Sequence, residues 1–329
     1  MPADTFRVAT FNVENLFARY RFRQNFDPRE EEGFTINNLA FDIFDEVEKR
    51  ITGEAIKEVD ADVIAFQEVE NLLVLDRFNS RYLAGKGYRY RVLIDGNDPR
   101  QIDVAVLSRY PLRNLRTHRH ERNRDSTGPL FSRDCLEVDV EIQGKLLTLY
   151  VNHFKSMMEG REETRERRVE QVGRVAEILD ATWQAGGYQG NFIVLGDFND
   201  YVDPNTSLGA LTSHPQLGNI VDRLPEGERW THFFAGGRRG EKTKQLDFIL
   251  LPTGLDTRAG HPAPGIMRAG LPFRAEDYTG PRLSGVGEND PKASDHCPVF
   301  VNRAIHLTQP TARGSVSGYG SVPADIGGV

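Results

Sequence analysis

Polar side chains that could catalyse a reaction or bind a metal stand at the ends of several short apolar runs of this sequence. The set comprises Asn12, Glu68, His153, Asp197, Asn199, Asp295 and His296. A strand end is a rigid place from which a sheet can hold reactive groups in a shared cleft. We therefore interpret the set as one site.

The residue types indicate oxygen-rich coordination of a hard divalent cation. Carboxylates dominate and no cysteine set accompanies them, so Mg²⁺ or Mn²⁺ is the natural occupant. Two histidines, each able to pair with an acid, would supply proton transfer near neutral pH. Asp247 strengthens this interpretation because it lies inside an apolar run, where a buried carboxylate needs a partner or a metal.

Each residue taken alone also has an ordinary structural interpretation. Asn12 and the GDFND segment at 196–200 suit turns, Glu68 suits a solvated strand end, and His153 suits a hydrogen-bonded structural histidine. The joint occurrence of suitable residues at five strand ends favours the functional interpretation.

Short apolar runs predict the strands that would position this site. Strands are expected at 6–12, 62–68, 88–94, 103–108, 135–142, 145–153, 191–197, 230–234, 245–251 and 297–302. Apolar residues at helical spacing predict helices over 38–59 and 161–183.

Alternation and turn residues predict how some strands pair. Residues 135–142 alternate apolar side chains with acids, which predicts one buried face, one wet face and antiparallel pairing. Gln143–Gly144 would form the hairpin turn into 145–153. Residues 230–234 and 245–251 are expected to form a second hairpin.

The order of these elements predicts two stacked sheets with helices outside them. No internal repeat or linker divides residues 1–303, which we interpret as one domain. Residues 304–329 are rich in Gly, Ser and Pro and are expected to form a disordered tail.

Composition predicts a soluble globular enzyme. No segment approaches the roughly 20 apolar residues of a membrane span, and the N-terminal residues lack the pattern of a secretory signal, which indicates a cytoplasmic protein. Cys135 and Cys297 each lie in an apolar run and are expected to be buried reduced thiols.

The net charge of −7 argues against a generic polyanion binder, because affinity for nucleic acid depends largely on Lys and Arg. Any phosphate recognition must therefore be local. Basic residues do concentrate between Arg109 and Arg133. A solvated loop and a phosphate-contacting loop both remain open interpretations of that segment.

Six motifs resemble, in the same order, those of the endonuclease/exonuclease/phosphatase superfamily. They are FNVEN (11–15), FQEVEN (66–71), VNHFKS (151–156), GDFND (196–200), LDFILL (246–251) and SDHCPVF (294–300). The resemblance spans roughly residues 6–302, and GDFND and SDHCPVF are its most specific parts. It implies a four-layer α/β sandwich of two packed mixed, largely antiparallel sheets flanked by helices, and a metal-dependent phosphoesterase that uses direct attack by water.

The resemblance also implies roles for the residues around the metal and the water. Glu68 would be the principal ligand of Mg²⁺ or Mn²⁺, with Asp295 and Asn12 beside it. His296, oriented by Asp247, would take a proton from the attacking water or hold the phosphate.

The remaining roles concern the substrate. Asp197 and Asn199 would position the water and the non-bridging oxygens, and His153 would contact the phosphate and the leaving oxygen. Further phosphate contacts would come from Asn12, Arg133 and Lys155. Asp103 is a lower-ranked candidate for the carboxylate that pairs with His153. For Arg133 and Lys155 a surface salt bridge is an equal alternative.

VNHFKS followed by an Arg-rich helix looks most like bacterial nuclease members, so DNA or RNA is the expected substrate and partner. A phosphomonoesterase, or a phosphodiesterase acting on phosphoinositide or sphingomyelin, is the alternative. An inactive binding protein on the same fold is disfavoured because the residue set is complete. Substrate choice would depend on loops 19–37, 109–132 and 256–292, and no obligate protein partner is evident.

Overall fold

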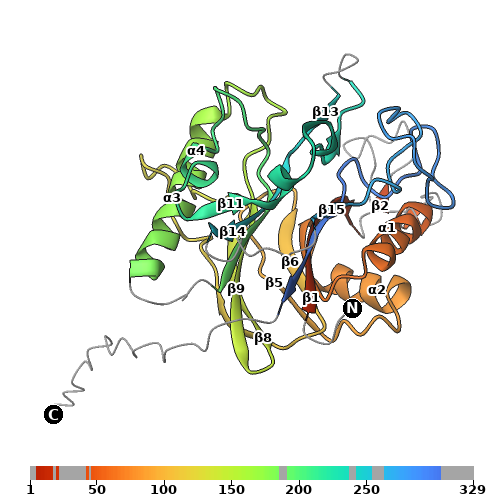
Figure 1. Cartoon of the computed structure of the whole chain (residues 1–329), viewed down its shortest axis with the longest axis horizontal. Coiled ribbons are helices and arrows are strands. Elements are labelled where there is room, and N and C mark those ends of the chain that lie inside the picture. The colour runs from red at the N-terminus through yellow and green to blue at the C-terminus, as the bar shows by residue number, and fades with distance from the viewer. Residues whose placement is uncertain are drawn as a thin grey trace, which may run out of the picture.

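The protein is built from two six-stranded sheets with helices on their outer faces (Figure 1). The computed structural model describes residues 5–17, 20–21, 42–43, 46–184, 191–236, 242–253 and 263–304. This arrangement confirms the predicted four-layer α/β sandwich. The tail is predicted to begin at residue 304, but Ala304 still belongs to the last strand; residues 305–329 lie outside the described residues.

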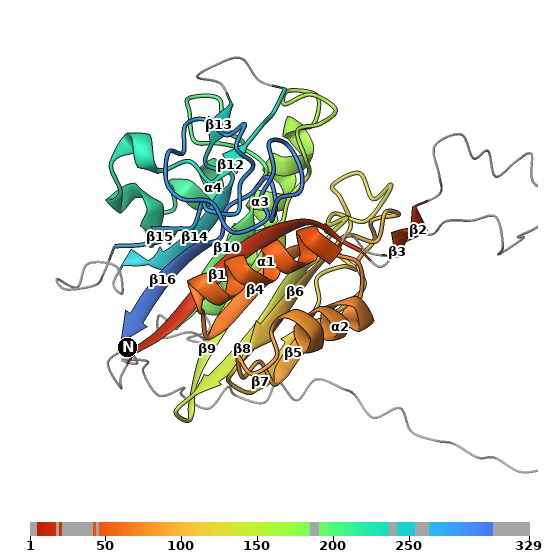
Figure 2. The ribbon, with the colours of Figure 1, turned by 90° about the vertical axis from the view of Figure 1, so that its right-hand side faces the viewer.

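The first sheet has the strand order β15-β16-β1-β4-β6-β5. Its strands are β1 (Thr5–Leu16), β4 (Val63–Val69), β5 (Tyr90–Leu93), β6 (Asp103–Ser108), β15 (Gly265–Ile266) and β16 (Val299–Ala304). Helices α1 (Glu46–Val59) and α2 (Leu72–Tyr82) cover its outer face (Figure 2). Among the described strands of this sheet, β1 and β4 pair in parallel and the other neighbours are antiparallel.

The second sheet has the order β11-β14-β10-β9-β8-β7. Its strands are β7 (Leu112–Arg116), β8 (Cys135–Ile142), β9 (Lys145–His153), β10 (Phe192–Asp197), β11 (Leu217–Asn219) and β14 (Asp247–Pro252). Helices α3 (Arg165–Gln184) and α4 (Gly209–Thr212) cover its outer face. Here too one pair, β9 with β10, is parallel.

Smaller elements complete the described chain. They are β2 (Tyr20–Arg21) paired with β3 (Asp42–Ile43), β12 (His232–Phe233) paired with β13 (Thr243–Lys244), and the 3₁₀ turns η2 (Ile220–Arg223) and η3 (Glu226–Glu228).

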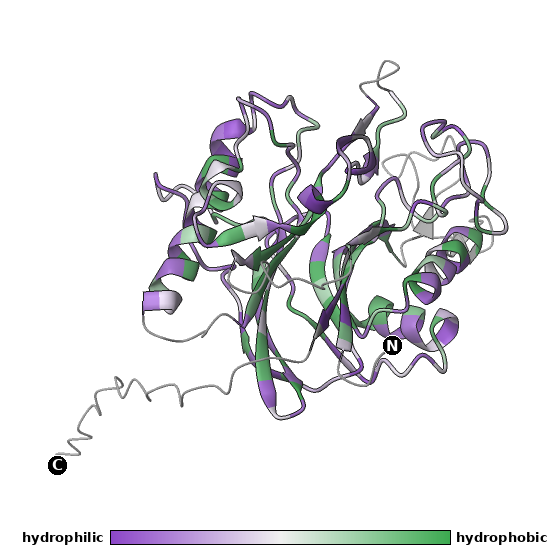
Figure 3. Ribbon diagram, in the orientation of Figure 1, coloured by the Kyte–Doolittle hydropathy of each residue, from purple (hydrophilic) through white to green (hydrophobic). Residues whose placement is uncertain are grey.

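Apolar side chains fill three layers. Val8, Val63, Leu149 and Ile193 belong to the core between the two sheets, where the strands of Figure 3 are mostly hydrophobic. Two further cores lie beneath the α1–α2 pair and beneath α3. Within the described segments, no helix is both long enough and apolar enough to cross a bilayer.

The turn at Gln143–Gly144 has the backbone that a two-residue hairpin requires. Both residues have positive φ, 51° and 74°, as in a type I′ turn, and Ile142 pairs with Lys145 across it. The predicted antiparallel pairing of β8 is confirmed.

The prediction of a wet face on β8 is wrong, because both faces are buried. Glu137 lies 3.0 Å from the guanidinium of Arg116. Asp139 accepts hydrogen bonds from Thr148 Oγ1 and Asn114 Nδ2 at 2.6 and 2.8 Å. Polar partners on neighbouring strands thus cover acids that alternation alone assigns to solvent.

Two other predictions need correction. The first helix begins at Glu46 rather than at 38, and Ile43 belongs to β3. Residues 230–234 do not pair with 245–251: β12 pairs with β13, while β14 enters the second sheet beside β10 and β11. In the sheet, β10 pairs with Asp247–Leu250 and β11 with Leu250–Pro252, which is more pairing than a two-residue strand could offer.

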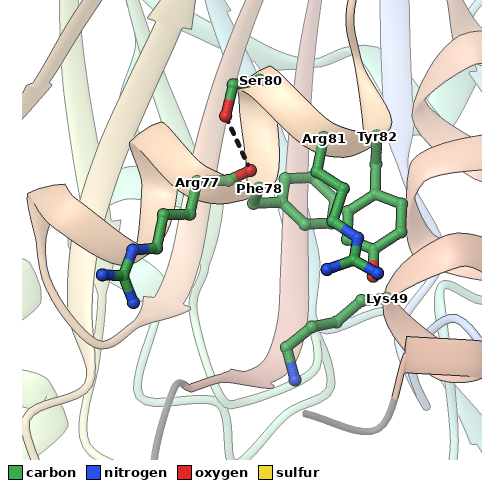
Figure 4. Close-up of a pocket in the computed structure, with 6 residues that line it drawn as sticks. All are labelled: Lys49, Arg77, Phe78, Ser80, Arg81 and Tyr82. Atoms are coloured by element: carbon green, nitrogen blue, oxygen red, sulfur yellow. Dashed lines mark hydrogen bonds between the residues drawn. The ribbon is translucent and has the colours of Figure 1, made fainter. Parts of the chain in front are cut away.

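The pocket drawn in Figure 4 lies beside α1 and α2, on the outer side of the first sheet. It is lined by Lys49, Arg77, Phe78, Ser80, Arg81 and Tyr82. None of the predicted site residues lines it, so the chemistry must be sought at the strand ends.

Candidate active site

The parallel strand pair of each sheet delivers its polar residues to the same edge of the sandwich. Strands β1 and β4 carry Asn12 and Glu68 near their carboxyl ends, and β9 and β10 end at His153 and Asp197. One hydrogen bond joins the two sheets here, from Asn12 Nδ2 to Asp197 Oδ2 at 3.0 Å. The ends of β1 and β10, which are far apart in the sequence, therefore meet at one edge, as the sequence predicts.

Asn12 bridges the two carboxylates at this edge. Its Nδ2 also lies 3.3 Å from Glu68 Oε1, and its amide oxygen accepts the backbone N–H of Glu14. Glu68 Oε2 accepts the backbone N–H of Asn15, and the backbone of Glu68 has a φ of 66°. A non-glycine residue held at positive φ costs free energy and is typical of a functional position.

Asp197 is the centre of the network. Its carboxylate accepts hydrogen bonds from Asn12 Nδ2 and from both the backbone and the side chain of Asn199, at 2.8–3.0 Å. Asn199 Nδ2 also donates to the carbonyl of Phe154. This fixes the GDFND turn against the end of β9.

Two imidazoles flank the Asp197 carboxylate. Oδ2 of Asp197 lies 3.4 Å from Nε2 of His153 and 3.8 Å from Nε2 of His296. His153 Nε2 is also 3.9 Å from Glu68 Oε1. Glu68 and His296 therefore belong to one cluster, as predicted.

His296 is oriented by Asp247, the predicted partner. Its Nδ1 lies 2.9 Å from Asp247 Oδ2, which also accepts from Thr231 Oγ1 at 2.7 Å. Thr231 in turn accepts the backbone N–H groups of Leu246 and Asp247. Both contacts are made by the same oxygen, Oδ2, which fixes the imidazole ring and leaves Nε2 of His296 facing the cluster.

The predicted pair of Asp103 with His153 is not formed. The Asp103 carboxylate accepts the backbone N–H of Gly96 at 2.9 Å, while His153 Nδ1 is buried and has no hydrogen-bond partner among the described residues. Gly96 permits this approach, since a Cβ there would meet Asp103 Oδ1 at 2.7 Å. The role of Asp103 toward His153 remains a prediction.

The two predicted basic phosphate contacts already have protein partners. The buried guanidinium of Arg133 donates to the carbonyl of Phe154 and lies 3.3 Å from Asp98 Oδ2. Lys155 Nζ lies 2.7 Å from Glu159 Oε1, the salt bridge given above as its alternative. Arg133 supports the end of β9 directly; phosphate contact by either residue stays a prediction.

Three residues at this edge, which the sequence motifs did not single out, are His232, Glu14 and Lys292. The His232 ring packs against that of His296 in a tilted arrangement, with ring centroids 4.5 Å apart, and its Nε2 is 3.7 Å from Asp295 Oδ2. Glu14 accepts the backbone N–H of Asp295 at 2.8 Å and pairs with Lys292. The FNVEN motif contains Glu14 and could have identified it, whereas the expected 230–251 hairpin concealed His232.

Burial dominates the electrostatics of the inner groups. Burial, together with the nearby Asp247 carboxylate, raises the pKa of Asp197 to about 7 against the opposing effect of His296. Burial also disfavours the cationic form of His296, but Asp247 and Asp197 outweigh it and raise its pKa well above the ordinary value. The pKa of His153 is held well below its usual range by burial and by the charge of Arg133.

The outer acids behave differently. Burial and the Asp295 carboxylate raise the pKa of Glu14 to about 7, although Lys292 opposes this. Burial alone would raise the pKa of Asp295, but His232 and His296 outweigh it and lower the pKa to about 2.

The donor set fits a divalent cation. Two groups of described side chains, His232 with Asp295 and His296, and Asp197 with Asp247 and His296, hold ligand atoms within 4.8 Å of one another. The Glu68 and Asp295 side chains are 19% and 36% exposed, against 1% for Asp197, so an ion arriving from solvent reaches the two predicted ligands first. Carboxylates gathered at such density need a counter-charge.

Replacing Asp103 with asparagine is expected to stabilise the protein at high pH. Burial raises the pKa of Asp103 to about 6, so the folded state binds its proton more tightly than the unfolded state, and stability falls as pH rises from about 4 to about 6. The variant should gain about 1–2 kcal/mol at pH 8 and nothing near pH 3.5. Urea unfolding at both pH values measures this, and an equal gain at both would rule out the charge as its cause.

Comparison with known proteins agrees with this geometry. Residues 7–217 match the sequence model of the Endonuclease/Exonuclease/phosphatase family. An endonuclease/exonuclease/phosphatase from Beutenbergia cavernae DSM 12333 is 18% identical, with a TM-score of 0.59 over 92% of this chain and 72% of that one. No curated protein matches the sequence.

Two further solved structures share the fold. TDP2 from D. rerio, complexed with a single strand DNA product, is 14% identical with a TM-score of 0.57, over 91% of this chain and 98% of that one. The human nocturnin catalytic domain with a bound sulfate anion is 15% identical with a TM-score of 0.54, over 91% and 95%. At these identities the likeness shows the fold alone.

Proposed function

We propose that this chain, which belongs to the endonuclease/exonuclease/phosphatase family, is a nuclease that hydrolyses phosphodiester bonds of DNA or RNA. Members of this family are metal-dependent phosphoester hydrolases. The observation that carries the proposal is the network around Asp197, which joins Asn12, His153, Asn199 and His296 from separate segments of the chain.

In this proposal Glu68 and Asp295 hold the divalent cation, Mg²⁺ with Mn²⁺ as a substitute. Asn12 aligns Glu68 through its amide nitrogen, and its oxygen is the third predicted ligand. When bound, the cation stabilises the negative charge that grows on the phosphate oxygens during attack.

Asp197 and Asn199 position the attacking water beside His296. A carboxylate only accepts hydrogen bonds, so Asp197 Oδ2, lying between two imidazole Nε2 atoms, is placed to orient a water proton. Nε2 of His296 is the atom available to the water or to a phosphate oxygen, because Nδ1 is engaged by Asp247. Both groups are held before the reaction begins, which lowers the cost of reorganisation.

His153 binds a phosphate oxygen through Nε2, and Asp103 would restrain its ring once the cleft is filled. Arg133 lies beneath the same edge, and its charge acts on Glu68 and Asp197. Lys155 leaves its salt bridge with Glu159 when it contacts the phosphate. Breaking this exposed ion pair costs little free energy.

Nucleic acid is the substrate favoured among those open to this fold. The D. rerio TDP2 structure contains a single strand DNA product, and the nocturnin structure contains a sulfate anion. The first of these observations supports nucleic acid as the substrate of this chain.

A substrate panel tests the proposal. The full chain with Mg²⁺ is incubated with plasmid DNA, single-stranded DNA, RNA, a phosphoinositide, sphingomyelin and a chromogenic bis-phosphodiester. Cleavage of a nucleic acid at a rate well above that of the lipids is expected. Hydrolysis confined to a lipid or a phosphomonoester would contradict the nuclease assignment.

Salt dependence gives a second, independent prediction. A nuclease that grips several phosphates should lose affinity steeply with salt, with log K falling by about 0.7 per phosphate contact for each unit of log[salt] on a single strand. KM for an oligonucleotide measured from 50 to 300 mM KCl should therefore rise steeply. A flat response would indicate a small-substrate phosphatase instead.

A further inference from the structure

The β12–β13 hairpin has one face turned toward the candidate active site and the other turned away. Phe233 is buried with Leu271 and Cys297, and Thr243 Oγ1 hydrogen-bonds to Asp277. These contacts define the packed face. Because successive side chains of a strand alternate between faces, His232 lies on the opposite face, and there it meets His296.

Phe234 lies on the same face as His232, one alternation further along. Its backbone N–H donates to the carbonyl of Lys242 at 2.7 Å, so one hydrogen bond still joins the two segments just beyond β12, which ends at Phe233. Two residues of strand place Phe234 about 7 Å beyond His232, a step comparable with one nucleotide of an extended strand. The ring is 58% exposed.

Lysines accompany this aromatic ring on the partner strand. Lys244 is the register partner of His232, and Lys242 faces Phe234, so both side chains share the cleft face. Lys244 Nζ lies 4.7 Å from the centre of the Tyr201 ring, directly after the GDFND segment. The hairpin therefore extends the site outward with two lysines and an exposed aromatic ring. Figure 2 shows the position of β12 and β13 in the fold.

We propose that this face of the hairpin, made by Phe234, Lys242 and Lys244, is a subsite for single-stranded nucleic acid. Phe234 stacks on an unpaired base next to the scissile phosphate, and the two lysines contact the flanking backbone. Base stacking on an aromatic ring with nearby cations is the mode by which single strands are bound without sequence preference. A duplex is excluded because its bases already stack on one another. This inference rests on the proposed nuclease function and specifies its substrate.

Abasic substitution tests the stacking directly. The full chain with Mg²⁺ is assayed on a short unstructured oligonucleotide, and on versions with one abasic residue at each position around the cleaved bond. Phe234→Ala should lower kcat/KM for the intact strand by roughly 5- to 150-fold, the range measured for base–aromatic stacking. On the strand that is abasic at the stacked position the same substitution should change the rate by less than about 2-fold, since the base that would be lost is already absent.

Matched variants guard against a general structural effect. Phe234→Trp should retain the wild-type rate. Tyr90→Ala removes an exposed aromatic side chain at the opposite end of the first sheet, where Tyr90 pairs with Ser108 and Ser108 with Val63, and should leave every substrate unaffected. The double variant Lys242→Gln/Lys244→Gln should reduce the slope of log K against log[salt] by about 1.4, which is two contacts at about 0.7 each.

The outcomes separate the two proposals. An equal loss on intact and abasic strands at every position, or an unchanged rate for Phe234→Ala, overturns the subsite while the nuclease function stands. Preference for duplex over single strand also overturns it. If the wild type cleaves p-nitrophenyl phosphate but no oligonucleotide, the nuclease function fails and the subsite fails with it.

Discussion

Replacement of Asp197 by asparagine, or of His296 by glutamine, is expected to lower kcat by about 10²- to 10⁴-fold, the usual contribution of a positioned acid–base group. Asparagine keeps the shape of Asp197 but removes the carboxylate that accepts hydrogen bonds from Asn12 and Asn199. Glutamine at 296 can still reach Asp247 but lacks the imidazole Nε2. Single-turnover rates on a phosphodiester would measure both effects.

The two losses should not multiply. Asp197 Oδ2 and His296 Nε2 lie 3.8 Å apart and are proposed to act on the same water, so the double variant should be little slower than the slower single variant. Asp180→Asn, on the outer face of α3 beside His214, is the matched control and should keep full activity. A folded Asp197 or His296 variant with the wild-type rate would remove that residue from the mechanism.

Chelation is expected to abolish activity, and Glu68→Gln to weaken cation binding by more than about 10-fold. The inference for Glu68 follows from its position, since its carboxylate is the most accessible acid of the inner network and is held by Asn12 and the backbone of Asn15. Loss of a group that merely orients a ligand already costs about 10- to 100-fold in metal affinity, so loss of a ligand should cost at least as much. Mn²⁺ binding followed by electron paramagnetic resonance measures this without an activity assay.

A carboxylate on an outer helix, away from the cluster, serves as the control. Glu54 lies on α1 and pairs with Lys57, so Glu54→Gln should leave Mn²⁺ binding unchanged. Activity that survives complete chelation would overturn the metal-dependent mechanism. Unchanged Mn²⁺ affinity in Glu68→Gln would show instead that the cation is held by the His232, Asp295 and His296 group.

The positions of the site residues follow from a feature that the two sheets share. In each sheet a single parallel pair lies near the middle, and parallel strands end at the same edge. Asn12 and Glu68 therefore meet His153 and Asp197. Asp247 is the first residue of β14, which pairs antiparallel with β10, and it lies directly opposite Asp197. The start of β14 therefore lies at the same edge as the carboxyl ends of the two parallel pairs.

The residue pattern alone identified the central strands of both sheets and the groups at their ends, but not the edge strands β7, β11 and β15. Val63–Val69, Phe192–Asp197 and Asp247–Pro252 are buried along almost their whole length. A continuous apolar run with a carboxylate at one end can be recognised from the sequence, because an apolar run of this length favours a buried strand whichever strand it pairs with. The cores and most of the site residues were accessible to sequence analysis for that reason.

Only the tertiary structure decided which segments pair and which polar groups are covered. The burial of Glu137 and Asp139 depends on Arg116, Asn114 and Thr148 of the adjacent strands. The contact of His232 with His296 forms because β12 pairs with β13 and not with β14. Pairing between distant segments is a competition among all available edges, and its outcome is not encoded in the periodicity of any one of them.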